Sequence, residues 1–249
     1  IGKFSTPVTG VAVDKTSTVS NGLSQTVYAM VDTLGVYKST NGGSSFTLMS
    51  GSPAMKFNDI TVDSNGDLLV SGAFYVYSYS KSANTWTKIT TPAKETTLIN
   101  NGIRLQSTVH PKNPNLLAVA VNTYVCEAIY YSTDRGATWK EILKSRGTGD
   151  YSGTVKNLMP WQKDTAIDSS PSWVAFDPFN DGRLLANAWY GTYQTLDYTA
   201  SPVQWEETTY GIEEAFVRAL LPMPEGARFE LLLGANDFCG LGINNVFEF

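Results

Sequence analysis

The 249-residue chain is 42% hydrophobic and only 16% charged, which supplies enough apolar material for a sizeable core and argues against disorder. The formal net charge of -5, with no Lys/Arg block, makes a nucleic acid an unexpected partner and favours a neutral ligand. No apolar run approaches the roughly 20 residues needed to span a bilayer, so no membrane partner is expected.

Cysteine and histidine are too rare to build a metal or redox site. The chain has only Cys126 and Cys239, far apart, which we expect to be buried thiols, and a single histidine, His110. His110 lies in the turn sequence TVHPKNPN, which favours a structural role over catalysis. We therefore expect no metal and no cofactor. The opening IGKFSTPVTG is typical of a processed or excised segment, so no signal peptide is expected in it.

One phrase recurs along the chain: an alternating apolar strand, an Asp or His with a turn, and a second apolar strand. We call the Asp or His of each phrase its anchor residue. The four clear copies read VTGVAVDKTS…QTVYAMVD, FNDITVDSNGDLLVSG, LQSTVHPKNPNLLAVAV and SWVAFDPFNDGRLLANAW, with the anchor residues Asp14, Asp63, His110 and Asp177. A weaker fifth copy is FVRALLPMPEGARFELLLGA. A polar insertion at residues 144–172 lengthens the interval between the third and fourth anchor residues, His110 and Asp177.

Each phrase predicts the two inner strands of a sheet, and two outer strands follow each of the first four. The outer strands are GVYKST and SFTLMS, VYSYSK and TWTKIT, AIYYST and TWKEIL, and GTYQTL and QWEETT. The one possible helix is a short turn near GIEEAF. The sequence predicts an all-β fold, a β-propeller of four-stranded antiparallel blades with about four to five blades, over 1–249 as one propeller domain or a fragment of one.

Two hairpins between outer strands share a pattern, STDRGATW at residues 132–139 and STNGGSSF at 39–46. Both resemble the Asp-box of sialidase-like propellers. We expect Asp134 to accept hydrogen bonds from its own turn, Gly136 to adopt a positive φ, and Trp139 to pack between sheets. The motif is interpreted as a folding device away from the ligand face.

The order of motifs from Thr108 onward resembles the first propeller of family-74 glycoside hydrolases, the xyloglucanases and oligoxyloglucan-specific cellobiohydrolases. The most specific segments are DPFN at 177–180 and GIEE at 211–214, and the resemblance covers nearly the whole chain. It implies a part of a seven-bladed propeller, with residues missing on both sides, in a secreted enzyme. The partners expected are a polysaccharide and the remaining part of a longer chain or another copy.

The family hydrolyses xylose-branched β-1,4-glucan with inversion, using two aspartates across a cleft. The resemblance maps one onto Asp237 in GANDFCGLG, where Asn236, Phe238 and Cys239 depart from the family pattern GDIGG. An apolar setting would raise the pKa of Asp237 and suit the acid. Asp32 in YAMVDTLGVYKS is the local candidate for the second carboxylate.

Aromatic residues on loops are the expected sugar platforms. Trp161, in the insertion, is the first candidate, and Trp189 with Tyr190 the second, while Glu213 and Glu214 are expected to support the site by hydrogen bonds. The remaining outer-strand tryptophans are interpreted as core: Trp86, Trp139 and Trp205.

Three functions remain open at this stage. The first is an endo- or exo-acting glycosidase on xyloglucan or a related β-1,4-glucan, which as a fragment could be inactive. The alternative is a non-catalytic Asp-box propeller that binds glycans or proteins. A sialidase is disfavoured, because few arginines are available for a carboxylate-binding triad.

Overall fold

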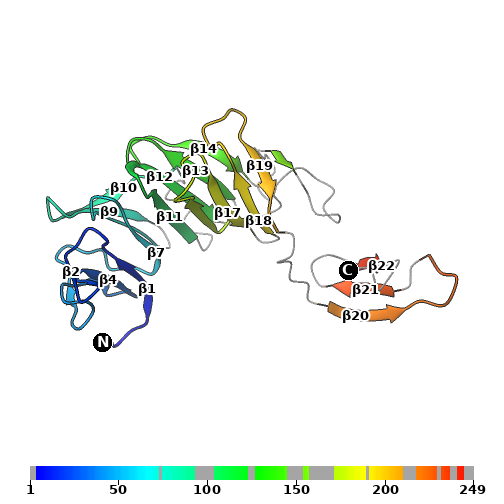
Figure 1. The fold of residues 1–249 in the computed structure, drawn as a ribbon, viewed down its shortest axis with the longest axis horizontal. Helices are drawn as coiled ribbons and strands as arrows, with labels where there is room; N and C mark the ends of the chain where they lie inside the picture. Colours follow the sequence, from blue (N-terminus) through cyan, green and yellow to red (C-terminus); the bar gives the residue numbers. More distant parts are fainter. Residues whose placement is uncertain are drawn as a thin grey trace. The chain divides into compact units, whose positions relative to one another are not determined.

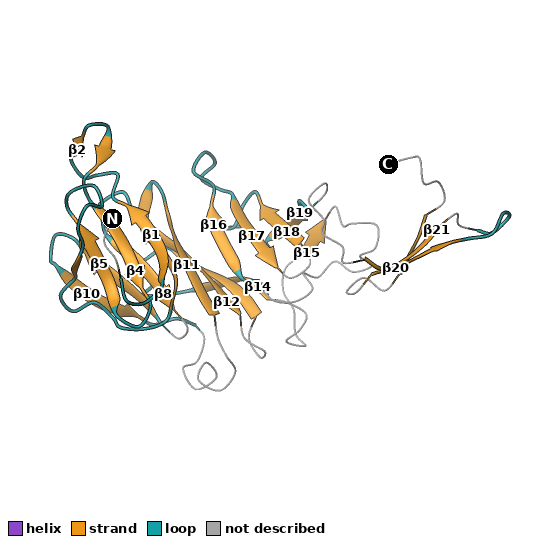
Figure 2. Ribbon diagram, turned by 90° about the horizontal axis from the view of Figure 1, so that it is seen from below, coloured by secondary structure: helices purple, strands orange, loops and turns teal. Residues whose placement is uncertain are grey.

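The computed structural model describes residues 4–72, 75–92, 104–122, 127–144, 154–156, 171–188, 191–209, 217–228, 231–235 and 240–243. Contacts divide the chain into two compact units: residues 1–157 with 164–208, and residues 158–163 with 209–249. Each unit is described separately below. The described residues hold strands and turns and no helix (Figure 2), hence none that could cross a membrane.

The first unit consists of four antiparallel sheets, each built from strands that follow one another in the chain. Sheet 1 contains β1 (Val8–Val13), β4 (Val27–Val31), β5 (Gly35–Ser39) and β6 (Thr47–Leu48). Sheet 2 contains β7 (Phe57–Val62), β8 (Leu68–Gly72), β9 (Val76–Ser80) and β10 (Thr85–Ile89). Sheet 3 contains β11 (Arg104–His110), β12 (Asn113–Asn122), β13 (Glu127–Ser132) and β14 (Lys140–Lys144). Sheet 4 contains β16 (Trp173–Phe176), β17 (Leu184–Ala188), β18 (Gly191–Thr195) and β19 (Gln204–Glu207).

These sheets stand side by side in chain order (Figure 1). The inner strands make the contacts from sheet to sheet: β1 with β7, β7 with β11, and β11 with β16. This is the radial arrangement of propeller blades, and it confirms the predicted all-β fold of four-stranded meanders. Every predicted pair of outer strands is present close to its predicted position.

The core lies between successive sheets because inner and middle strands are apolar on both faces. On β8, Leu68 and Val70 join the cluster shared with sheet 1, whereas Leu69 joins the cluster shared with sheet 3. Alternate side chains of a strand point to opposite faces, so one strand serves two seams. A middle strand of a sheet that is covered on both faces therefore has a continuous apolar sequence, as LLV in β8 shows.

Two features go beyond the predicted meander. A small hairpin of β2 (Val19–Ser20) and β3 (Leu23–Ser24) interrupts the first phrase. Within the insertion at 144–172, β15 (Thr154–Lys156) pairs in parallel with β19 and extends the outer edge of sheet 4. Val155 is buried there, so this part of the insertion covers a sheet edge that would otherwise offer unpaired backbone groups.

The second unit holds a three-stranded antiparallel sheet of β20 (Val217–Pro222), β21 (Leu231–Ala235) and β22 (Gly240–Ile243). β20 and β21 correspond to the weaker fifth phrase, whose hairpin pairing is thereby confirmed. The predicted turn at GIEEAF, Cys126 and Cys239 all lie outside the described residues.

Candidate functional site

The inner strands of the first unit run in one direction, which gives the sheets two distinct ends. Asp59 near the start of β7 contacts Gln106 near the start of β11, and His110 at the end of β11 packs on Phe176 at the end of β16. We call the end where the inner strands begin the leading end. The other is the anchor end, where the anchor residues Asp14, Asp63, His110 and Asp177 lie.

All four anchor residues are buried, from 0% to 7% exposed, and they organise turns. Asp14 accepts hydrogen bonds from the backbone and hydroxyl of Thr16, and Lys81 of sheet 2 reaches it at 2.8 Å. Burial alone would raise the pKa of Asp14, but the hydrogen bonds from Lys81 and Thr16 outweigh burial and lower it. The contacts of the anchor residues are therefore structural: they hold turns together and, at Asp14, join two sheets.

The Asp-box-like hairpins also lie at the anchor end, between β5 and β6 and between β13 and β14. Asp134 accepts hydrogen bonds from the backbone N–H and the hydroxyl of Thr138, which lower its pKa to about 2. Gly136 has φ of 88°, and a Cβ there would stand 2.6 Å from Ile89 of sheet 2. Both expectations for this turn are confirmed, and its place supports the interpretation as a folding device.

The three tryptophans interpreted as core all pack towards the preceding sheet. Trp205 is fully buried and donates to the carbonyl of Ile142, while Trp139 is half-buried and donates to the carbonyl of Thr90. Trp86 is half-buried against the cluster between sheets 1 and 2. Trp205 therefore has no exposed face for a sugar, whereas Trp86 and Trp139 keep part of their surface exposed.

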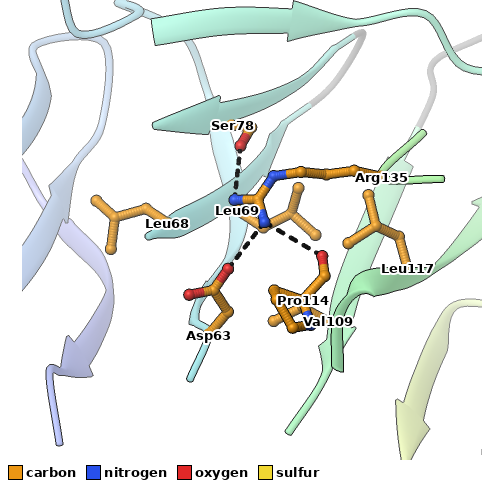
Figure 3. Close-up of a pocket in the computed structure, with 8 residues that line it drawn as sticks. All are labelled: Asp63, Leu68, Leu69, Ser78, Val109, Pro114, Leu117 and Arg135. Atoms are coloured by element: carbon orange, nitrogen blue, oxygen red, sulfur yellow. Dashed lines mark hydrogen bonds and ion pairs between the residues drawn. The ribbon is translucent and has the colours of Figure 1, made fainter. Parts of the chain in front are cut away.

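A pocket between sheets 2 and 3 is shown in Figure 3, where Arg135 reaches across the seam to Asp63 and Ser78 and also donates to the carbonyl of Pro114 in its own sheet. Its cavity of about 10 Å³ has room for about one water molecule. A sugar ring does not fit there, so this pocket belongs to the packing of the seam.

In the first unit, the strand order places predicted site residues in connections at the leading end and not at the anchor end. Asp32 follows β4 at the leading end of sheet 1, and residues 189–190 join the end of β17 to the start of β18. In the second unit, residues 236–239 join β21 to β22, at the end of that sheet where β20 begins. Six predicted residues lie outside the described part of the chain: Asp237, Trp161, Trp189, Tyr190, Glu213 and Glu214.

Asp32 is the one predicted site residue that the structure describes. It is half-buried, its backbone N–H donates to the carbonyl of Pro7 at 3.0 Å, and Thr33 beside it has φ of 62° and donates to Met55. The Oδ1 atom of Asp32 is buried and accepts no hydrogen bond from the described residues. A buried carboxylate oxygen that lacks a donor costs free energy in a folded protein, so the described residues satisfy this carboxyl only in part.

Asp59 and Gln106 form a second polar group at the leading end that the sequence reasoning missed. The Gln106 amide donates to Oδ2 of Asp59 at 2.6 Å and accepts from the backbone N–H of Val174 at 2.8 Å. One side chain thus links the inner strands of sheets 2, 3 and 4. Burial raises the pKa of Asp59, and the hydrogen bonds from Gln106 and Ile60 oppose the rise.

The described residues contain no group of three His, Cys, Asp or Glu side chains that could hold a metal ion. The described residues at the leading end include carboxyl and amide groups. The carboxyls among them are Asp32, Asp59, Glu127 at the start of β13 and Glu207 at the end of β19, and burial raises the pKa of Asp59. Such groups suit hydrogen bonding to, and proton exchange with, a neutral oxygen-rich ligand.

No protein-family model matches the chain. The xyloglucanase Xgh74A of Acetivibrio thermocellus is 27% identical over 94% of this chain and 31% of its own length, and a Paenibacillus xyloglucanase is 26% identical over 92% and 25%. The crystal structure of the GH74 xyloglucanase from Xanthomonas campestris superposes with a TM-score of 0.77, at 20% identity, over 94% of this chain and 35% of that one. The chain spans between a quarter and a third of the length of the curated relatives it matches.

Proposed function

We propose that this chain, which is related over most of its length to the family-74 xyloglucanases, is part of a glycoside hydrolase that degrades xyloglucan or a related β-1,4-glucan. The observation that carries the proposal is the match to xyloglucanases over 94% of the chain. The placement of several described carboxyls at the leading end, among them Asp32 and Asp59, supports it, because carboxyl groups are what acid–base chemistry on a glycan requires.

The proposed chemistry is hydrolysis with inversion of configuration by two carboxyl groups. An inverting hydrolase needs a protonated acid for the leaving oxygen and an ionised carboxylate for the water, roughly 6.5 to 9.5 Å apart. We assign the acid to Asp237 and the carboxylate to Asp32. The position of Asp32 directly after β4 at the leading end, where it is only half-buried, supports its part of this assignment.

Sugar binding is assigned to Trp161, Trp189 and Tyr190, with support from Glu213 and Glu214. Within the described residues, Trp86, Trp139 and Trp205 pack in the seams, whereas Trp173 at the start of β16 is 45% exposed. A secreted protein is the corresponding proposal for location, because the polymer is too large to be taken up intact. We also propose that residues 1–249 are one propeller domain or a piece of one.

The test is xyloglucan hydrolysis by the intact protein and by its Asp237→Asn variant. Loss of a general acid is expected to lower kcat at least about 100-fold while leaving KM nearly unchanged. The matched control is Asp197→Asn, which should keep full activity, because Asp197 is an exposed carboxylate in an anchor-end turn and accepts hydrogen bonds from Thr199. An unchanged kcat in Asp237→Asn would contradict the assignment of the acid. Inversion is tested separately, by proton NMR of the anomeric configuration of the first product.

A non-catalytic glycan-binding propeller is the second candidate. The observation that favours it is the replacement of the family's GDIGG by NDFCG around Asp237. It predicts that the intact protein binds xyloglucan without releasing reducing sugar. Reducing-sugar release by the wild type, absent from Asp237→Asn, decides for the hydrolase.

A further inference from the structure

The first residue of β16 stands apart from the seam that the rest of the strand forms. Val174 and Phe176 are buried, and Phe176 packs on His110 of sheet 3. Successive side chains of a strand point to opposite faces, so Trp173 lies on the face of sheet 4 that is turned away from sheet 3. Its side chain is 45% exposed. The packing between sheets 3 and 4 therefore does not account for this tryptophan.

Trp173 begins a row of side chains that crosses sheet 4 near its leading end. Asn187 of β17 is its partner in register, and Thr192 of β18 is the partner of Asn187. Thr208, directly after β19, donates its backbone N–H to the carbonyl of Thr192 at 2.8 Å. Side chains directly opposite each other on antiparallel strands share a face, with Cβ atoms about 4.5–5.5 Å apart. We call these four residues the leading-edge row; each is partly or largely exposed, and none is ionisable.

The chemistry of the leading-edge row complements a neutral sugar. An indole ring offers a flat apolar face to the C–H groups of a pyranose, while amide and hydroxyl groups pair with its hydroxyls. The hydroxyls of Thr192 and Thr208 lie 3.1 Å apart. Ser172 donates to Oδ1 of Asn187 at 3.1 Å, which leaves the N–H donors of that amide directed elsewhere. The row thus combines one stacking surface with several hydrogen-bonding groups.

Hydrogen bonds hold the backbone on both sides of Trp173. The N–H of Ser172 donates to the carbonyl of Asn187 at 3.0 Å, within sheet 4. The N–H of Val174 donates at 2.8 Å to the side-chain oxygen of Gln106, which is 5% exposed and belongs to sheet 3. The tryptophan is thus carried by a strand start that is tied to two sheets. A platform held in this way loses little conformational freedom when a sugar stacks on it.

We propose that the leading-edge row binds a sugar residue of a neutral glycan, with the ring stacked on Trp173 and a hydroxyl bonded to Asn187. The inference rests on the proposed function, since it takes the ligand to be xyloglucan or a related β-1,4-glucan. Trp189 and Tyr190, which are already assigned to sugar binding, lie in the chain between Asn187 and Thr192. The row therefore extends that assignment to the described strands on either side of this connection. A glycan without charge also matches a row without charge.

The experiment is isothermal titration calorimetry of the intact protein with a xyloglucan oligosaccharide. Trp173→Ala removes the stacking surface and is expected to weaken binding about five- to thirtyfold, whereas Trp173→Phe should recover most of the affinity. Phe179→Ala is the matched control, because Phe179 is an aromatic residue at the anchor end that is 92% exposed. This control should bind the oligosaccharide as tightly as the wild type.

Urea denaturation of the same variants separates binding from packing. Because Trp173 is exposed, Trp173→Ala should keep the wild-type midpoint of unfolding. Wild-type affinity in Trp173→Ala overturns the inference, and so does a marked loss of stability in that variant, which would show that another part of the protein packs on the indole. If the wild type hydrolyses xyloglucan in either case, the proposed function stands, whereas a wild type that neither binds nor hydrolyses it rejects both.

Discussion

Asp134 and Asn41 show why a turn motif survives replacement of its central residue. Each accepts a hydrogen bond from the backbone N–H four residues on, at 2.8 and 2.9 Å. The hydrogen bond to the hydroxyl of the residue four positions on runs in opposite directions in the two turns. Asp134 accepts from the Thr138 hydroxyl, whereas the Asn41 amide donates to the Ser45 hydroxyl. A hydroxyl can do either, so the geometry is conserved while the chemistry changes.

The lowered pKa of Asp134 predicts the pH range in which this hairpin loses stability. A carboxyl that titrates at about 2 when folded and near 4 when unfolded stabilises the fold above pH 4, and this contribution is lost as pH falls towards 2. Asp134→Ala should therefore melt at a lower temperature than the wild type at neutral pH, with the difference shrinking below pH 4. Thermal unfolding followed by circular dichroism measures this, and a constant difference down to pH 2 contradicts it.

Asp59 and Gln106 mark the limit of sequence reasoning for single residues. Asp134 was predictable because its partners lie within four positions, and turn chemistry is local. Asp59 and Gln106 bond across 47 positions, and their meaning appears only when β7 and β11 stand side by side. The polar residues inside the strands FNDITV and RLQSTV were the available signal, because a polar residue in an inner strand needs a partner.

At the scale of strands and turns, period-2 alternation and turn residues predicted nearly everything in the first unit. The strands are buried between sheets, so their pattern is strong and their ends are set by Asp, Asn and Gly turns. β15 was not predicted, because three residues that complete a sheet edge carry no period of their own. Most of the predicted site lies in connections between strands, whose sequences carry no strand period, so its residues could be proposed from the family resemblance but not from periodicity.

Arg135 gives a prediction for the seam between sheets 2 and 3. Its guanidinium lies 3.1 Å from Asp63 and 2.9 Å from Asp67, and Asp63 is almost fully buried. Arg135→Ala leaves that carboxylate without its cation and should lower the free energy of unfolding by about 2 kcal/mol, less than for a fully buried pair because Arg135 is partly exposed. Urea denaturation measures the loss.

The double variant Arg135→Ala with Asp63→Asn separates the ion pair from the turn. If the pair causes the loss, the two changes together should cost less than the sum of the single changes. Additive costs would show that Asp63 acts only through its hydrogen bonds to Asn65 and Asp67.

Across the whole first unit the seams use two chemistries in succession. Lys81 of sheet 2 reaches the anchor residue of sheet 1, and Arg135 of sheet 3 reaches that of sheet 2. At the third seam the anchor residue is His110, which packs edge-to-face on Phe176, and Phe176 packs on Tyr198. An ion pair from Lys112 to Asp181 crosses this seam as well, so the difference lies in the anchor residue, which takes an aromatic contact where Asp14 and Asp63 take a cation.

This third seam makes the fold sensitive to mild acid. The Nδ1 atom of His110 accepts from the backbone N–H of Lys112, while Nε2 has no hydrogen-bond partner among the described residues and lies 3.9 Å from Asp181. Burial lowers the pKa of His110, and Asp181 opposes the shift. A proton on Nδ1 would face the Lys112 donor, so the folded protein holds this ring neutral.

Because its folded pKa lies below its unfolded value, His110 contributes stability that is present above about pH 6.5 and is lost as pH falls below it. The free energy of unfolding should fall by up to about 1.4 kcal/mol per pH unit in that range. His110→Phe, which can keep the contact with Phe176, should remove this slope in urea denaturation, and Asp181→Asn should extend it to lower pH. A wild-type slope in His110→Phe would place the acid sensitivity elsewhere, whereas its loss would show that one buried ring at one seam sets the acid limit of four packed sheets.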